Sequence, residues 1–164
     1  MTYEQTPEGN ILITATANLK ALLDTIVYSV SFLVTESGAM DISVTFDLTQ
    51  IQGIFPALPR VGVQMLLPGG FDEYSWYGNG PHENYSDRLH SALVGVYESS
   101  VQAQHFNYIR PQETGNRCGV RWSAVKNALG NAWRAEATGA PLSASVSPYS
   151  QDNLTTALVS GEFF

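Results

Sequence analysis

The sequence predicts an all-β fold, an antiparallel β-sandwich. Three observations indicate it: many short segments that alternate apolar and polar residues, breaks rich in glycine and proline, and a single short stretch with helix signals. Several short strands at close spacing are typical of a sandwich or barrel. The 164 residues are long enough to bury a core, and no repeat or linker divides them. We therefore expect one domain over residues 1–164.

The clearest predicted element is a hairpin over residues 26–48. Residues 40–48 alternate regularly between apolar and polar side chains. This pattern is typical of an antiparallel strand with one face in water. A second stripe of period two covers residues 26–34, and the glycine-containing link 36–39 joins the two strands.

Further short strands are predicted before and after this hairpin. They cover residues 11–16, 61–67, 71–77, 94–97, 120–125, 133–137 and 142–146. A loop is predicted at 78–81, which holds two glycines and a proline. Ser150 is placed to cap a brief helix over 151–158. The chain ends on Ser-Gly-Glu-Phe-Phe at 160–164, an apolar end with no visible partner strand, so we expect the sandwich to be truncated at its C-terminus.

The composition excludes several classes of partner. The net charge is −7, and the eight Lys and Arg residues form no basic stripe, so we expect neither nucleic acid nor an anionic membrane surface as a partner. No apolar run approaches the roughly 18 residues of a membrane-spanning helix. Residues 1–5 lack the features of a signal peptide, and the compartment stays open between cytoplasmic and periplasmic. Cys118 is the single cysteine, which excludes an internal disulfide and a thiolate metal site.

Two polar segments, residues 76–88 and 108–122, carry the candidate site residues. The first packs two carboxylates, a histidine, two amides, an arginine and aromatic rings around glycines and a proline, and the second holds several arginines. Binding residues often gather on such loops when a rigid sheet holds them. The candidate substrate-binding residues are His82, Glu83, Asp87, Arg88 and Glu113.

The carboxylates of these segments allow two interpretations. Glycoside hydrolysis needs two carboxylates about 5–5.5 Å or 6.5–9.5 Å apart, and the available pairs are Glu83 with Asp87, or either of them with Glu113. In the second interpretation the carboxylates pair with arginines and hold the two segments together, because buried charges persist only when paired. The arginines in reach are Arg88, Arg110, Arg117 and Arg121. We favour the second interpretation and predict no catalytic residue in this chain.

The remaining reactive side chains give little support for catalysis. The three histidines, His82, His90 and His105, show no spacing of a zinc motif, so no metal ligand is predicted. His82 or His105 could carry a proton, as sugar mutarotation requires, although a single histidine is more often only a hydrogen-bonded polar residue. Cys118 stands at the start of a predicted strand, which favours a packed thiol over a nucleophile.

Three segments in a fixed order resemble a known family. They are Leu-Pro-Arg-Val-Gly at 58–62, Trp-Tyr-Gly-Asn-Gly-Pro-His-Glu-Asn-Tyr-Ser-Asp-Arg at 76–88 and Arg-Pro-Gln-Glu-Thr-Gly-Asn-Arg at 110–117. Together they resemble the C-terminal small-chain domain, domain 5, of glycoside hydrolase family 2 β-galactosidases. The hairpin residues 38–42 also fit, so the resemblance covers nearly the whole chain.

The resemblance implies a super-sandwich fold of the galactose-mutarotase type, attached after a catalytic TIM barrel. In that family the catalytic glutamates lie on the barrel, and the magnesium and sodium ligands come from other domains. It therefore implies no cofactor in this segment and no catalytic residue. The tryptophan that the family's small-chain domain adds to the galactoside pocket has no match in Trp76, Trp122 or Trp133.

The function implied by the resemblance is a non-catalytic module of a β-galactosidase that acts on terminal, lactose-type β-D-galactosides. The expected partners are the remainder of the β-galactosidase chain or its large subunit, with a galactoside and a second copy of the chain as further candidates. One alternative is a stand-alone carbohydrate-binding or aldose-epimerase-like domain. Another is an interaction module whose loops make only subunit contacts. Fold alone does not decide between them, because unrelated functions share one scaffold.

Overall fold

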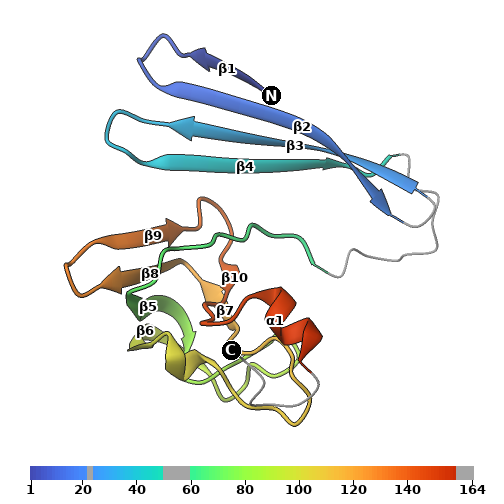
Figure 1. Cartoon of the computed structure of the whole chain (residues 1–164). Coiled ribbons are helices and arrows are strands. Elements are labelled where there is room, and N and C mark those ends of the chain that lie inside the picture. The colour runs from blue at the N-terminus through green and yellow to red at the C-terminus, as the bar shows by residue number, and fades with distance from the viewer. Residues whose placement is uncertain (22–23, 50–59, 158–164) are drawn as a thin grey trace. The chain divides into compact units, whose positions relative to one another are not determined.

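The computed structural model of the chain describes residues 1–21, 24–49 and 60–157 (Figure 1). The described residues are almost entirely β, and all named strand pairs are antiparallel. The predicted all-β fold of antiparallel sheets is therefore confirmed. The chain forms two compact units, Met1–Val63 and Gln64–Phe164. One domain over 1–164, its mutarotase-type topology and its truncation stay predictions.

The first unit is one four-stranded meander. Its strands β1 (Thr2–Gln5), β2 (Ile11–Ala21), β3 (Asp24–Val34) and β4 (Met40–Asp47) lie side by side in chain order. The strand predicted at 11–16 is thus the first part of a longer one, whereas β1 was not predicted. All four residues of β1 are exposed, which explains why they show no apolar alternation.

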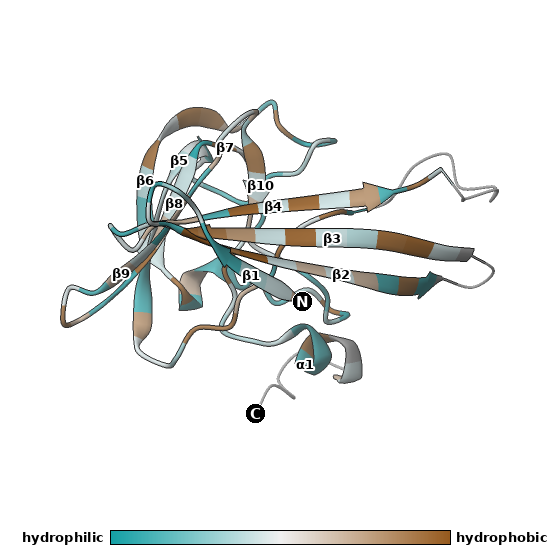
Figure 2. Ribbon diagram, turned by 90° about the horizontal axis from the view of Figure 1, so that it is seen from above, coloured by the Kyte–Doolittle hydropathy of each residue, from teal (hydrophilic) through white to brown (hydrophobic). Residues whose placement is uncertain are grey.

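The predicted hairpin is confirmed as β3 and β4. Tyr28 pairs with Phe46 across the ladder, and their rings stack with centroids 5.9 Å apart. In the turn, the Thr35 amide donates to the Ala39 carbonyl over 2.9 Å. Figure 2 shows the alternating apolar and polar bands along both strands. The polar residues of β4 are exposed and the apolar ones from Ile42 onward are half-buried, so the period-two pattern faces water on one side.

The second unit contains two further sheets and two short helices. The four-stranded sheet has the order β6-β5-β8-β9, and β10 pairs with β7 in a two-stranded sheet. The elements are β5 (Phe71–Gly80), β6 (Leu93–Ser100), a 3-10 helix (Gln102–Gln104), β7 (Arg117–Val120), β8 (Trp122–Asn127), β9 (Ala132–Glu136), β10 (Leu142–Ala144) and α1 (Gln151–Thr156).

Helix α1 begins where the sequence predicts. The Ser150 hydroxyl accepts a hydrogen bond from the Asn153 amide over 3.2 Å, and a capping box is present. Residue 158, where the prediction ended the helix, lies outside the described residues, as do residues 58–59 of the family-like motif and residues 160–164. The 3-10 helix at 102–104 was not predicted.

The core of the second unit is built on the buried face of β5. Tyr74 and Trp76 are 3% and 1% exposed, and their rings stack with centroids 5.0 Å apart. Val101, Val120 and Val125 complete the buried cluster. The tryptophan of the family-like motif is therefore a core residue, since almost no part of it remains accessible to a ligand.

The loop predicted at 78–81 is wrong for its first three residues. They continue β5 and pair with residues 93–95 of β6. Glycine is needed there for close packing and not for a turn: a Cβ on Gly78 would lie 2.9 Å from the Cα of Val120. The glycine-rich composition therefore marks a strand that another backbone approaches closely.

Two predicted strands also need correction. Residues 61–67 form no strand, because nothing in the described part of the chain pairs with them, and Val61, Val63 and Met65 are more than half exposed. An extended segment becomes a strand only with a ladder partner. The predicted strand 120–125 is split at Arg121, because Val120 pairs with β10 whereas β8 pairs with β5 and β9.

Candidate functional site

The predicted site residue Glu83 lies at the centre of a hydrogen-bonded group, which we call the Glu83 cluster: Glu83, Arg88, Tyr108 and Gly115. Its Oε1 accepts from the Arg88 Nη2 over 2.6 Å and from the Tyr108 hydroxyl over 2.7 Å. Its Oε2 accepts from the Gly115 amide over 2.6 Å. The Glu83 side chain is only 16% exposed. Both carboxylate oxygens are therefore engaged within the protein.

Arg88 closes the cluster on its exposed side. Its guanidinium forms the ion pair with Glu83 and lies over the Tyr85 ring, 4.6 Å from the centroid. The hydrogen bond to Tyr108 is the main cause that raises the pKa of Arg88. Burial, reinforced by the charge of Glu83, raises the pKa of Tyr85. Both groups keep the protonated form in which they contact their neighbours.

The Gly115 amide reaches Glu83 because the backbone bends sharply at that glycine. Its φ is +80°, in the left-handed region, and a Cβ there would lie 2.6 Å from the Gln104 carbonyl oxygen. A side chain at this position would be strained and would collide with backbone. The local sequence Thr-Gly-Asn therefore directs a main-chain donor at the carboxylate.

Asn84, the residue after Glu83, is buried and links the loop that follows β5 to strand β7. It is fully buried, and its Oδ1 accepts from the Cys118 amide over 2.8 Å while its Nδ2 donates to the His82 carbonyl over 2.9 Å. Its backbone exchanges hydrogen bonds with Asn116. A buried side-chain amide whose polar groups are hydrogen-bonded holds the surrounding backbone in one specific arrangement.

Arg117, the first residue of β7, is a buried cation. It is 4% exposed and stacks over Trp76, 4.8 Å from the ring. It donates to the carbonyls of Gly115 and Asn116 and, over 2.7 Å, to the Gln104 Oε1. All three acceptors are neutral. Burial lowers the pKa of Arg117, and a cation–π contact of about 2 kcal/mol is smaller than the several kcal/mol that burying an ion costs.

A hollow of about 350 Å³ lies beside Glu83 and Arg117. Besides these two, its walls hold two histidines, two polar residues and an aromatic pair: His82, His105, Ser99, Gln104, Phe106 and Tyr108, together with Pro81 and Ala103. The volume is at the small end of the range for ligand pockets, roughly 300–1,000 Å³. The hollow is the place where the predicted candidates His82 and Glu83 meet residues of the segment 102–108.

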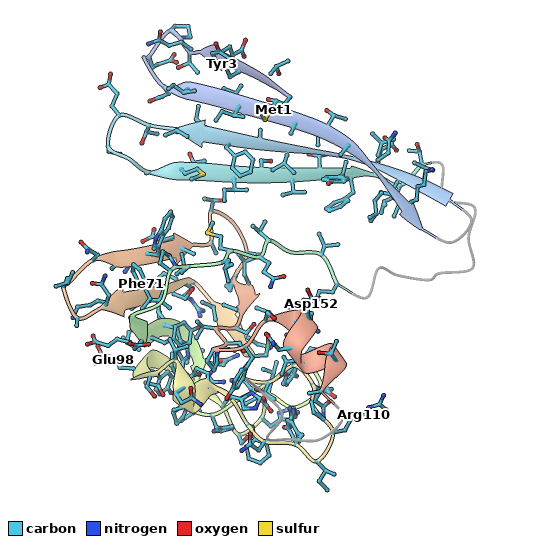
Figure 3. All side chains as sticks on the ribbon, in the orientation of Figure 1. Met1, Tyr3, Phe71, Glu98, Arg110 and Asp152 are labelled. Atoms are coloured by element: carbon cyan, nitrogen blue, oxygen red, sulfur yellow. The ribbon has the colours of Figure 1, made fainter. Side chains whose placement is uncertain are left out.

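The structure separates the other predicted candidates. Asp87 is exposed and makes no hydrogen bond or ion pair with the residues that the structure describes. Glu113 contributes its backbone carbonyl, which accepts from the Tyr85 hydroxyl at 3.5 Å. Arg110 is exposed and points away from the unit (Figure 3). Arg121 lies over the Tyr77 ring, 4.9 Å from its centroid. The expected pairing of carboxylates with arginines is thus present for Glu83 with Arg88.

The histidines and the cysteine have different surroundings. His82 is exposed and its Nε2 shares a hydrogen bond with the Ser91 hydroxyl over 2.9 Å. His105 contacts Tyr149 edge-on, with centroids 4.8 Å apart. His90 is exposed. Cys118 is buried, 3.4 Å from the Asn116 Nδ2, as expected of a packed thiol.

Several residues of the site were not predicted. Gln104 lies in a three-residue helix without a sequence signal, and Asn84 and Tyr108 stood inside the polar segments without being singled out. Neutral side chains give no charge pattern by which to find them. Asn84 could have been suspected as a site residue, because in the family-like motif it stands between Glu83 and Tyr85.

The described residues support neither a metal site nor a membrane-spanning helix. No three His, Cys, Asp or Glu side chains are grouped there so as to hold a metal ion. Within the same residues, no helix has the length and apolar composition needed to cross a bilayer.

Comparison with known proteins identifies the family. The family model described as "Beta galactosidase small chain" matches residues 2–163. A β-galactosidase from Halalkalibacterium halodurans is 29% identical over 157 residues, which are 96% of this chain and 15% of that protein. One from Lactobacillus delbrueckii subsp. bulgaricus is 35% identical over 129 residues, 79% of this chain and 12% of that protein. One from Vibrio cholerae is 53% identical over 66 residues, 40% of this chain and 6% of that protein.

The chain thus spans a small part of the length of each of these relatives. The match nevertheless covers nearly the whole chain and includes the strands and loops that form the Glu83 cluster. The chain belongs to the β-galactosidase small chain family.

Proposed function

We propose that this chain is a non-catalytic module of a β-galactosidase that hydrolyses terminal β-D-galactosides, and that it supports the catalytic barrel and the assembly. The main support for the proposal is that the Glu83 carboxylate is already hydrogen-bonded within the chain. A carboxylate that acts as acid, base or nucleophile must reach the substrate. Here three donors occupy its two oxygens and tie residue 83 to residues 88, 108 and 115.

Support also comes from the other polar groups of the two loops. The Asn116 side chain donates a hydrogen bond to the Asn84 carbonyl. Arg117 donates hydrogen bonds to main-chain carbonyls and to the side-chain oxygen of Gln104. Such contacts fix the loops as rigid surfaces on which a neighbouring domain can pack. On this proposal the catalytic carboxylates, magnesium and sodium belong to the rest of the parent protein, and this chain holds no cofactor.

An activity assay tests the proposal. The chain alone is expected to give no hydrolysis of a chromogenic β-galactoside. Addition of the chain to a parent enzyme from which the matching segment has been deleted is expected to restore hydrolysis. The variant Glu83→Ala should restore less, whereas Asp87→Asn, at an exposed neighbouring carboxylate, should restore as much as the unchanged chain. Hydrolysis by the chain alone would overturn the proposal.

A second candidate is an aldose-epimerase-like activity. One observation favours it: the hollow brings His82, His105 and Glu83 together, and mutarotation needs one group that takes a proton from the anomeric hydroxyl and another that gives a proton to the ring oxygen. Polarimetry of freshly dissolved α-D-galactose with and without the chain distinguishes the candidates. Accelerated mutarotation that is lost in both His82→Ala and His105→Ala would favour the second.

Self-association is a further part of the proposal. The apolar face of the first unit's sheet lines a hollow of about 380 Å³ with residues such as Val30, Phe32 and Val44. Apolar surface that stays half-exposed in this way promotes association. Size-exclusion chromatography with light scattering should show dimers at high concentration, and a monomer throughout the range would contradict self-association.

A further inference from the structure

Among the described residues, Arg117 is the one arginine in the walls of the hollow, and Glu83 is the one carboxylate there. The oxygens of that carboxylate are already hydrogen-bonded to Arg88, Tyr108 and Gly115. Arg117 therefore has the Coulomb attraction of Glu83 but no hydrogen bond to any anion among the described residues. Buried cations in proteins are usually paired with an anion.

The donors of Arg117 point to the same conclusion. Its Nη atoms bond to neutral oxygens only, and its buried Nε has no hydrogen-bond partner in the described part of the chain. An anion beside Arg117 would gain both from the guanidinium and from the low dielectric of a partly enclosed site.

The walls of the hollow limit which anion fits. The Phe106 side chain is 60% exposed, and Pro81 and Ala103 add further apolar surface, so a carbon skeleton has something to pack against. Ser99 and His82 supply hydroxyl and ring-nitrogen groups for hydrogen bonds. The volume of about 350 Å³ is large enough for a small molecule.

We propose that this hollow binds a small hydroxylated organic acid, whose carboxylate is the missing counter-ion of Arg117. The site goes beyond the proposed role of the chain in a β-galactosidase and does not depend on it. The carbon chain of the acid packs on Phe106, and its hydroxyls lie toward Ser99 and His82.

A matched pair of ligands tests the charge requirement. The chain, labelled with ¹⁵N, is titrated with sodium gluconate and, separately, with sorbitol, which has the same number of carbons and no carboxylate. Sodium chloride keeps the ionic strength equal. Gluconate is expected to cause saturable shifts of the Gln104, Phe106 and Gly115 amides in the millimolar range, and sorbitol none. Equal shifts with sorbitol, or no saturation with gluconate, would overturn the proposal.

A matched pair of variants tests the role of Arg117. Replacement of Arg117 itself risks unfolding, because its guanidinium is buried on Trp76. Gln104→Glu instead places a carboxylate where Oε1 now accepts from Arg117 over 2.7 Å, and so supplies the counter-ion internally. Gln102→Glu adds the same charge to the same short helix at an exposed position. Gln104→Glu should weaken gluconate binding at least tenfold, and Gln102→Glu by less than twofold.

The folded state of both variants is checked by their amide spectra before titration. Undiminished gluconate binding by a folded Gln104→Glu variant would show that Arg117 is not the anion's partner. An equal loss of binding in both variants would assign the effect to general charge repulsion, which also contradicts the proposal.

Discussion

The two units of the chain are held together in different ways. Among the described residues of the first unit, Ile26 is the one hydrophobic side chain below a tenth exposed, and the apolar face of its sheet is only half-buried. The second unit has a buried aromatic and valine core beside a buried polar network. The first unit depends on a main-chain ladder between neighbouring strands, whereas the second depends on side chains that meet from distant parts of the sequence.

The largest effect should come from the core of the second unit. Trp76→Ala removes a side chain that is 1% exposed and contacts the rings of Tyr74 and Tyr97. We expect a loss of about 4 kcal/mol in the free energy of unfolding, since large-to-small core changes leave a cavity. Urea unfolding followed by near-ultraviolet circular dichroism measures it. A loss below 1 kcal/mol would mean that this core does not stabilise the unit.

The next effect should come from the Glu83 cluster. Glu83→Gln replaces a charged acceptor with an amide whose NH₂ group must face one of the three present donors. The expected loss is about 3 kcal/mol, because removing one partner leaves the others unsatisfied. The exposed Asp87→Asn serves as the control and should change the unfolding free energy by less than about 0.5 kcal/mol. If both variants lost a similar amount of unfolding free energy, the hydrogen bonds of Glu83 would not contribute to the stability of the second unit.

Alkaline pH should destabilise the second unit through Tyr74. Burial raises the pKa of Tyr74 from 10.0 to about 12. The unfolded chain therefore loses this proton before the folded chain does, so the contribution of Tyr74 to stability is constant below about pH 10 and falls by about 3 kcal/mol between about pH 10 and 12. Tyr74→Phe should flatten this fall, and Tyr3→Phe, at a position 82% exposed, should not. An unchanged slope in Tyr74→Phe would refute the assignment.

The smallest effects compare one residue type in both units. Val125 is buried in the second unit's core, and Val44 is half-buried on the first unit's sheet. Val125→Ala should cost about 2 kcal/mol and Val44→Ala about 1 kcal/mol, since the loss follows the apolar area buried. Amide hydrogen exchange resolves the two units separately. Equal losses would mean that the first unit's sheet is covered as fully as the core.

The sequence allowed the hairpin β3–β4 of the first unit to be predicted better than the end of β5 in the second. Alternation along residues 26–48 is local and needs only the ladder between adjacent segments, so β3 and β4 were found with nearly correct bounds. The segment 61–67 has the same alternation but pairs with no strand among the described residues, and the sequence of one segment does not reveal which strand it pairs with. Gly78 and Gly80 were taken for a loop because their close neighbours, Val120 and Tyr97, lie 42 and 17 residues later in the chain, respectively.

The candidate site shows the same limit. Glu83 and Arg88 are five residues apart, and their pairing was among the expected ones. Tyr108 and Gly115 reach Glu83 across 25 and 32 residues, respectively. The polar residues around them pointed to the segment but not to the atom that Tyr108 and Gly115 contact. Gln104 gave no signal, because a neutral amide becomes notable only once Arg117 is seen buried beside it.

The long reach of the Glu83 contacts has a consequence for folding kinetics. The cluster can form only after β7 has come together with the end of β5, since residues 83, 108 and 115 must all be in place. We expect the cluster to form after the rate-limiting step of folding, because the entropy of closing these loops must be lost before its contacts can form. Weakening the cluster should then leave the refolding rate nearly unchanged and increase the unfolding rate, as expected for positions unformed in the transition state. In that case Glu83 would set how long the folded second unit persists, and contribute little to how quickly it appears.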